Sequence, residues 1–191
     1  MTTKIRWIAL STIFFATAAN AQVVMTHGTV LGQSCYLQTR INGDAVRALE
    51  TCTLALERDL MGANDRAATF DNRGVILDRM QRLEEAQADF DKAIALRPDL
   101  GDAYVNRGAV LIKKKLYGDA LAQIERGMTL GTSFPFIAEY NRALALQLLG
   151  RNREAYEGYH KVLVLEPNFG PATERLKDFS VMRRSAAPVT N

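Results

Sequence analysis

Apolar and small residues in the middle of the chain recur with the spacing of an amphipathic helix. Phe70, Gly74 and Leu77 lie at i, i+4 and i+7, so they share one helical face. A second set has the same spacing: Ala86, Phe90 and Ala93. The stretch MQRLEE between them predicts a turn, and Pro98 predicts a stop because proline lacks an N–H and clashes with the preceding helical turn. Residues 67–98 therefore predict a helical hairpin.

This hairpin returns along the chain. The Asn-Arg-Gly of residues 72–74 reappears at 106–108, and a weaker copy, Asn-Arg-Ala, occupies 141–143, so the copies are spaced by 34 and then 35 residues. Second-helix positions return at matching offsets: Ala120, Ile124, Ala155, Tyr159, Val162 and Pro167. A period that holds in both halves of the unit predicts an array of hairpins.

The pattern resembles the tetratricopeptide repeat, a 34-residue unit with Gly or Ala early, Ala-x-x-x-aromatic later and Pro at the end. The resemblance implies an all-α fold, a right-handed α-solenoid of stacked helical hairpins. We place an array at 67–183, with full units at 67–100, 101–134 and 136–169 and a capping helix at 171–183. Residues 184–191 are expected to be a disordered tail.

The period extends upstream into a divergent hairpin. Ala48, Cys52 and Ala55 align with the second-helix positions of the first unit, and the partner helix is predicted at roughly 33–41. The link LMGAND then breaks the period by four residues. Residues 22–66 therefore predict an N-terminal segment followed by this hairpin.

Cys35 and Cys52 are the two cysteines of the chain, and both lie in the divergent hairpin. If the hairpin turns at Asn42-Gly43, antiparallel helices bring the two cysteines to the same height, which a disulfide requires. A structural disulfide is favoured and is worth about 3 kcal/mol in the chain-entropy model. Two alternatives stay open: a pair of buried free thiols, and a redox-active pair, which the absence of Cys-x-x-Cys disfavours.

The first 21 residues differ from the rest. Lys4 and Arg6 precede the apolar run WIALSTIFFATAA, and Ala19-x-Ala21 has the small-x-small pattern of a cleavage site. The run is shorter than the roughly 20 residues that a membrane-spanning helix needs. We expect residues 1–21 to be a signal peptide, and the protein to be exported and periplasmic or secreted.

Composition and charge mainly argue against several classes of function. The 191 residues are 48% hydrophobic, enough for one substantial core. Removing Lys4 and Arg6 lowers the formal net charge from +3 to +1, which gives no support for nucleic-acid binding. His27 and His160 are too few and too far apart for a metal site or a nucleophile–base pair. We therefore expect no catalysis, no cofactor, no metal and no small-molecule substrate.

The candidate binding residues come from the resemblance. In tetratricopeptide proteins, the stripe beside the core-facing one lines a concave groove, and an Asn there hydrogen-bonds the backbone of an extended peptide. The resemblance carries this role to Asn72, Asn106 and Asn141, because a side-chain amide both donates and accepts. Further candidate peptide-binding residues flank them: Asp71, Val105 and Tyr140. The alternative, that each Asn serves only the stack, stays open.

The residues that flank this stripe run from charged in the first unit to apolar in the third, where Ile137 and Leu144 stand. The partner segment is thus expected to be hydrophobic at one end, unless the capping helix covers the apolar patch. The family's clamp for a C-terminal carboxylate needs basic residues where Asp71 and Asp102 stand, so acidic tails are not expected as ligands.

The sequence thus predicts an exported scaffold or adaptor that binds a peptide segment of a partner protein in its concave groove. The alternative is a structural subunit of an envelope complex that docks by its convex face or its ends. A thiol redox protein that uses Cys35 and Cys52 is the remote alternative.

Overall fold

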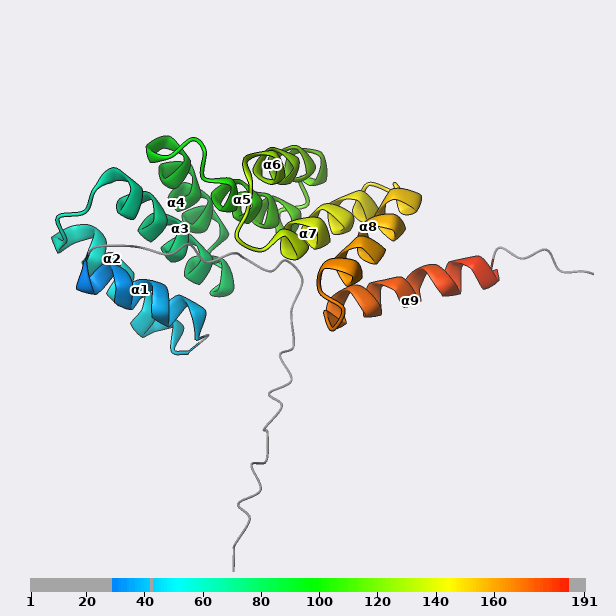
Figure 1. Cartoon of the computed structure of the whole chain (residues 1–191), viewed down its shortest axis with the longest axis horizontal. Coiled ribbons are helices and arrows are strands. Elements are labelled where there is room, and N and C mark those ends of the chain that lie inside the picture. Colours follow the sequence, from blue (N-terminus) through cyan, green and yellow to red (C-terminus); the bar gives the residue numbers. More distant parts are fainter. Residues whose placement is uncertain (1–28, 42, 186–191) are drawn as a thin grey trace, which may run out of the picture.

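The computed structural model describes residues 29–41 and 43–185 (Figure 1). The predicted signal peptide, His27 and residues 186–191 lie outside these ranges. The described part of the chain forms nine helices: α1 Val30–Arg40, α2 Ala45–Arg58, α3 Ala63–Arg79, α4 Leu83–Leu96, α5 Gly101–Lys113, α6 Tyr117–Leu130, α7 Pro135–Leu148, α8 Asn152–Leu165 and α9 Gly170–Ser185.

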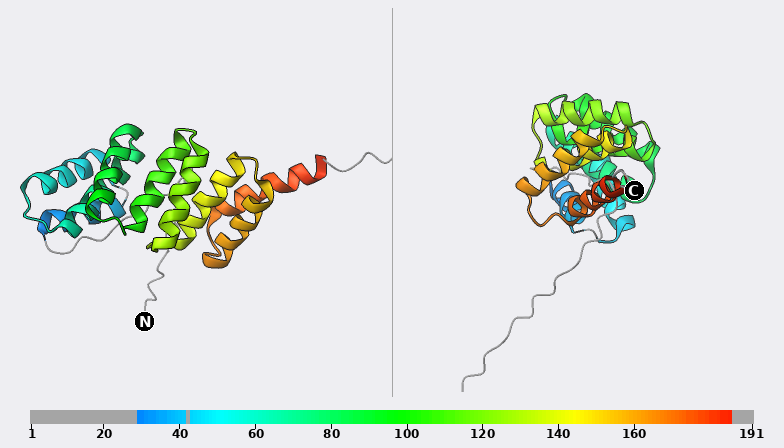
Figure 2. Two further views of the ribbon diagram at one scale, coloured as in Figure 1. Left: turned by 90° about the horizontal axis from the view of Figure 1, so that it is seen from above. Right: turned by 90° about the vertical axis from the view of Figure 1, so that its right-hand side faces the viewer.

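Consecutive helices pair into hairpins, α1 with α2, α3 with α4, α5 with α6 and α7 with α8, and α9 follows as a single helix. The hairpins stack in chain order, with α3 against α5 and α5 against α7. The stack bends into an arch that has α6 on its outside and α1 and α9 on either side of its opening (Figures 1 and 2). We call α1, α3, α5 and α7 the inner helices and α2, α4, α6 and α8 the outer helices. The predicted all-α solenoid of stacked hairpins is confirmed.

Close approach of inner and outer helices explains the small residues of the repeat. A Cβ on Gly74 would lie 2.5 Å from Cε1 of Phe90, and a Cβ on Gly108 would lie 2.5 Å from Cγ1 of Ile124. In the hairpin of α7 and α8 the glycine lies on the outer helix instead: a Cβ on Gly158 of α8 would lie 2.9 Å from the Cβ of Ala143 on α7. Each of these three hairpins thus has one glycine where its two helices touch.

The turns between inner and outer helices share one backbone geometry. Gln81, Lys115 and Gly150 have φ of 61°, 63° and 78°, and they lie at equivalent places in the three hairpins. The next residue donates its N–H to the carbonyl of the residue five positions earlier at 2.9 Å in each case: Arg82 to Leu77, Leu116 to Leu111 and Arg151 to Leu146. This is the hydrogen bond of a Schellman cap, in which a left-handed residue ends the helix.

The two ends of the stack are built differently. Cys35 of α1 and Cys52 of α2 form a buried disulfide with Cα atoms 4.7 Å apart, which joins the first hairpin. At the other end, α9 packs on α8, and Phe179 lies against the rings of Tyr156 and Tyr159 with centroid separations of 5.7 and 6.1 Å. The first hairpin is held covalently and the last by aromatic packing.

Candidate functional site

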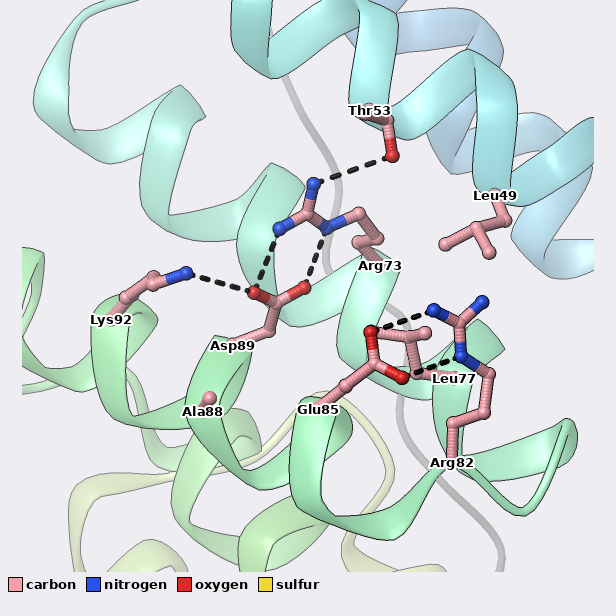
Figure 3. A pocket seen from close by; sticks show the side chains of 9 residues that line it. All are labelled: Leu49, Thr53, Arg73, Leu77, Arg82, Glu85, Ala88, Asp89 and Lys92. Carbon is pink, nitrogen blue, oxygen red and sulfur yellow. Dashed lines mark hydrogen bonds and ion pairs between the residues drawn. The ribbon is translucent and has the colours of Figure 1, made fainter.

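The contacts of the arginine in each Asn-Arg pair show which side of the inner helix faces the outer helices. Arg73 donates Nε and Nη2 to the Asp89 carboxylate of α4 at 2.6 and 2.9 Å, and Nη1 to the Thr53 hydroxyl of α2 at 3.3 Å (Figure 3). Both partners lie on outer helices. Arg73 therefore points outward, between two neighbouring hairpins.

The other two arginines have the same role. Arg107 pairs with Asp91 of α4 at 2.6 Å and also donates to Gln123 of α6. Arg142 pairs with Glu125 of α6 at 3.0 Å. Each arginine thus contacts the outer helix of the preceding hairpin, and the first two also contact the outer helix of their own. The sequence analysis missed this function, although the signal was there in the same 34- and 35-residue spacing.

The residue two places before each arginine turns the opposite way. Two positions along an α-helix correspond to a rotation of about 200°, so Asp71, Val105 and Tyr140 lie on the side of each inner helix that is opposite its arginine. Asp102, five positions before Arg107, lies on the same side by the same geometry. Asn72, Asn106 and Asn141 precede the arginines by one residue and flank this side.

These polar residues are buried. We call Asp71, Asn72, Asp102, Asn106 and Asn141 the concave stripe; their exposed fractions are 0, 0, 4, 1 and 0%. Asn106 Nδ2 of α5 lies 3.1 Å from both carboxylate oxygens of Asp71 on α3 and donates to them. This contact joins the hairpin of α5 and α6 directly to the hairpin of α3 and α4.

Burial also sets the electrostatics of the stripe. Desolvation raises the pKa of Asp71 well above its usual range; the amide of Asn106 lowers this pKa, and the nearby Asp102 raises it further. Desolvation raises the pKa of Asp102 as well, although the Ser133 hydroxyl and N–H donate to its carboxylate at 2.6 and 2.8 Å. Two neighbouring carboxyl groups are thus held where ionisation is disfavoured.

Val105 and Tyr140 are buried for different reasons. Val105 touches α6, since a Cβ on Gly127 would lie 2.7 Å from its Cγ2. The Tyr140 ring lies 5.3 Å from that of Phe169, just before α9, and Leu176 and Phe179 of α9 pack on the same apolar cluster. The C-terminal helix and the turn before it therefore cover the apolar third unit, which is the alternative that the sequence had left open.

Further polar contacts join the C-terminal ends of the inner helices. Lys113 Nζ of α5 lies 2.8 Å from both carboxylate oxygens of Asp78 on α3. Arg79 Nη1 donates to the Thr39 carbonyl of α1 at 2.6 Å. The sequence alone does not identify these partners, because the pairing depends on how the hairpins stack.

Two depressions lie where the arginines emerge. The first, of about 230 Å³, is drawn in Figure 3 and is lined by Leu49, Thr53, Arg73, Leu77, Arg82, Glu85, Ala88, Asp89 and Lys92. The second, of about 220 Å³, is lined by Glu139, Arg142, Glu154, Glu157, Gly158 and Lys161. In the first, Arg73 pairs with Asp89 and Arg82 pairs with Glu85 at 2.6 Å. The Arg73 pair joins α3 to α4, whereas the Arg82 pair lies within the start of α4.

Other kinds of site receive no support from the described residues. Within the ranges that the structure covers, no group of three or more His, Cys, Asp or Glu side chains is placed to hold a metal ion. His160 stacks on Tyr156 with the ring centroids 4.5 Å apart. None of the helices in the described ranges has both the length and the apolar character to cross a bilayer.

Comparison with known proteins supports the repeat. Residues 67–100 match the tetratricopeptide repeat family. The chain is 25% identical over 123 residues to a DnaJ homolog subfamily C member 7 homolog of Dictyostelium discoideum, covering 64% of this chain and 22% of that protein. It is 39% identical over 88 residues to the Hsp70-Hsp90 organizing protein of Triticum aestivum, covering 46% and 15%. The chain thus spans about a fifth of the length of these relatives.

Solved structures share the fold. MamA from Desulfovibrio magneticus RS-1 superposes with a TM-score of 0.62 at 22% identity, over 82% of this chain and 87% of that one. The first tetratricopeptide domain of Spaghetti, bound to the HSP90 peptide SRMEEVD, gives a TM-score of 0.59 at 24% identity, over 63% and 98%. At these identities the likeness concerns the arrangement of the helices.

Proposed function

We propose that this chain, in which residues 67–100 match the tetratricopeptide repeat family, is an exported scaffold or adaptor that binds an extended segment of a partner protein along the concave side of its arch. The observation that carries the proposal is the placement of Asn72, Asn106 and Asn141 at equivalent positions on three adjacent inner helices. Side-chain amides at regular intervals match the alternating donors and acceptors of an extended backbone.

The solved complexes support this kind of ligand. In the Spaghetti domain, a tetratricopeptide fold holds a peptide of HSP90. The ligand of the present chain differs in chemistry, because buried carboxyl groups, Asp71 and Asp102, stand on the concave side. Neither carboxyl group supplies the positive charge that would pair with an acidic tail. The proposed partner segment is therefore neutral or basic where it passes these two residues.

Export is the second part of the proposal. It is supported by the N-terminal sequence and by the disulfide between Cys35 and Cys52, since disulfides persist in oxidising compartments. The mass of the protein isolated from intact cells tests it. A chain that begins at Gln22 and is released with the periplasm or the medium is expected, and a full-length chain retained in the cytoplasm overturns export.

The test of peptide binding is a crosslinking pull-down from the native compartment, read by mass spectrometry. Wild type is compared with the triple variant Asn72→Ala, Asn106→Ala, Asn141→Ala. The matched control replaces three exposed asparagines by alanine: Asn64, Asn152 and Asn168. Partners captured by wild type and by the control, and lost from a folded triple variant, support binding on the concave side. Partners that survive in the triple variant overturn it.

A second candidate function is favoured by one contact. The bond from Asn106 to Asp71 joins α5 to α3, as expected if the Asn residues serve only the stack of a structural subunit. Thermal melting of Asn106→Ala separates the two functions. A large fall in melting temperature with unchanged partners supports the structural subunit, and a small fall with lost partners supports peptide binding.

A further inference from the structure

The side of α1 opposite its buried residues is apolar and exposed. Val30, Leu37 and the C-cap residue Ile41 have exposed fractions of 81, 55 and 71%. Together with Ser34 they lie on one side of the helix, because each is three or four positions from the next. We call Val30, Ser34, Leu37 and Ile41 the α1 seam. Figure 1 shows the hairpin of α1 and α2 at one end of the stack and α9 at the other.

The corresponding position on α3 is buried against a preceding hairpin. Cys35 contacts the outer helix of its hairpin at the place where Gly74 contacts the outer helix of the next one. This aligns α1 with α3, so Leu37 corresponds to Ile76. Ile76 is buried in one cluster with residues of α1 and α2. The side chain that is exposed on the first inner helix is thus covered on the second.

The same position packs on the preceding hairpin throughout the array. Val110 of α5 lies in one buried cluster with residues of α3 and α4, and Ala145 of α7 lies in one with residues of α5 and α6. The position of Val30 is also fully buried on the other three inner helices, where it is Thr69, Ala103 and Ala138. The α1 seam therefore has the place of a stacking surface, but α1 is the first helix of the described ranges.

We propose that the α1 seam docks on the α1 seam of a second copy of this chain, in a two-fold contact between the two first hairpins. The spacing of the seam favours this occupant. Its residues follow one another after four, three and four positions, which is the spacing of the contact line between two helices that pack side by side. Leu37 and the β-branched Ile41 alternate along this line, a combination that favours pairs of helices.

Two identical seams can meet without burying an unpaired polar group. The only polar residue of the seam is Ser34, and its hydroxyl already donates to the Val30 carbonyl at 2.8 Å. Helix α1 contains no Asp or Glu. Arg40 donates Nη1 to the hydroxyl of Tyr36 at 3.3 Å, and its guanidinium lies over that ring. Tyr36 is about 100° from Leu37 around the helix, so this charge is held beside the seam rather than on it.

The other end of the array does not offer a matching surface. Glu174 and Lys177 of α9 are exposed and pair with each other at 2.6 Å. A contact of the seam with these groups would withdraw charges from water against aliphatic side chains, which is costly. A contact between two seams is isologous instead, so it closes on two copies and leaves no free end at which a fibre could grow.

The contact is small, so the dimer is expected to be weak. Helices α1 and α2 are 11 and 14 residues long. The end face that they form is roughly 20 Å across, at 1.5 Å per residue and about 8–10 Å between axes, and falls below the standard size of a protein interface. The disulfide already fixes α1 on α2, so little ordering opposes association. A Kd in the micromolar range is expected.

This inference goes beyond the proposed function and does not depend on it. The seam contains none of the residues of the concave stripe. A dimer joined at the first hairpins would carry two concave sides, and a partner with two binding segments would gain affinity by avidity.

The test is sedimentation equilibrium of the chain purified from the compartment in which it accumulates, at concentrations up to about 200 µM, well above a micromolar Kd. Wild type should show an equilibrium between monomer and dimer. Leu37→Glu should raise the Kd at least about tenfold, because a carboxylate would be buried unpaired in an apolar contact. The matched control is Val164→Glu on α8, an aliphatic residue that is 80% exposed and lies outside the seam. It should dimerise like wild type.

A second variant gives a gain of association, which a folding defect does not produce. Ser34→Leu completes the apolar line and should lower the Kd about tenfold, because one more aliphatic side chain is buried per copy. With p-benzoylphenylalanine at position 37, crosslinks between two copies should map to α1. Wild type that stays monomeric at the highest concentration, Leu37→Glu that dimerises like wild type, or Val164→Glu that is as impaired as Leu37→Glu overturns the proposal.

Discussion

At the residue scale, the repeated Asn-Arg pair has two functions in opposite directions. Asn106 bonds Asp71 on the concave side, whereas Arg107, the next residue, bonds Asp91 and Gln123 of the outer helices. The helical rotation of about 100° per residue separates the two side chains. The dipeptide Asn106-Arg107 thus ties α5 to the preceding hairpin on two sides of the helix.

Asp71 gives a prediction about pH. Because burial raises its pKa in the folded chain, the folded state holds the proton more tightly than the unfolded state does. The resulting stabilisation is fully present below the unfolded pKa and is lost as the pH rises through the folded pKa. Denaturant unfolding from pH 7 down to about 4 should show wild type gaining free energy of unfolding relative to Asp71→Asn. A difference that does not change with pH contradicts the raised pKa.

Gly74 gives a prediction about packing. Gly74→Ala places a Cβ against the buried ring of Phe90, and overpacking of this kind costs about 1–3 kcal/mol. The matched control is Gly118→Ala on α6, where a Cβ meets nothing within 4 Å. That change should stabilise the chain by roughly 0.5–1 kcal/mol, since alanine is the better helix residue. Equal effects of the two variants on chemical denaturation are incompatible with the close contact.

At the element scale, the hairpins differ in what holds them. Gln81 and Lys115 adopt a left-handed backbone that glycine adopts more easily, and the hairpin of α7 and α8 has glycine at this place, Gly150. The first hairpin has a buried disulfide instead of the repeated small-residue contact. Its two helices stack in line with the other hairpins, but they are joined to each other by a covalent bond.

Reduction should therefore loosen one end of the stack. A disulfide that closes a loop of this length contributes about 3 kcal/mol, and hairpins in a solenoid depend mainly on their neighbours. Hydrogen exchange with reductant should show α1 and α2 losing protection while α6 and α7 retain it. The variant Cys35→Ala, Cys52→Ala is the control and should not respond to reductant. Uniform loss of protection along all hairpins would falsify this local role.

At the scale of the whole molecule, the arch ends in a cap. Leu176 and Phe179 of α9 pack on the largest apolar cluster, which includes Tyr140 and Tyr159, while Glu174 and Lys177 face the solvent. A solenoid needs such a polar outer face at its end, because an uncovered repeat surface is apolar.

Deleting residues 170–191 should expose this cluster. The loss of the half-buried Leu176 and Phe179 is expected to cost about 2–4 kcal/mol, with increased binding of an apolar dye and self-association in size-exclusion chromatography. A chain that ends at Ser185 is the matched control and should behave as wild type. A monomeric truncated chain with an unchanged melting temperature rules out the capping role.

The sequence by itself determined the features that depend on interactions within one helix or one hairpin. Hydrophobic spacing, the small residues at 74 and 108 and the recurrence of Asn-Arg depend on neighbours along one helix or across one hairpin, so they predicted the helices, the pairing and the stacked all-α fold. The disulfide between Cys35 and Cys52 was likewise predictable, because it depends only on where the chain turns between two neighbouring helices.

Only the tertiary structure decided which side chains meet between hairpins. The contacts of Asp71 with Asn106 and of Asp78 with Lys113 join residues 35 positions apart, and they depend on the rotation of one hairpin on the next. The same holds for Tyr140, whose burial depends on where α9 returns. The 34-residue period predicts which positions are equivalent. The angle at which the hairpins stack determines whether the side chain at such a position contacts another hairpin or the solvent.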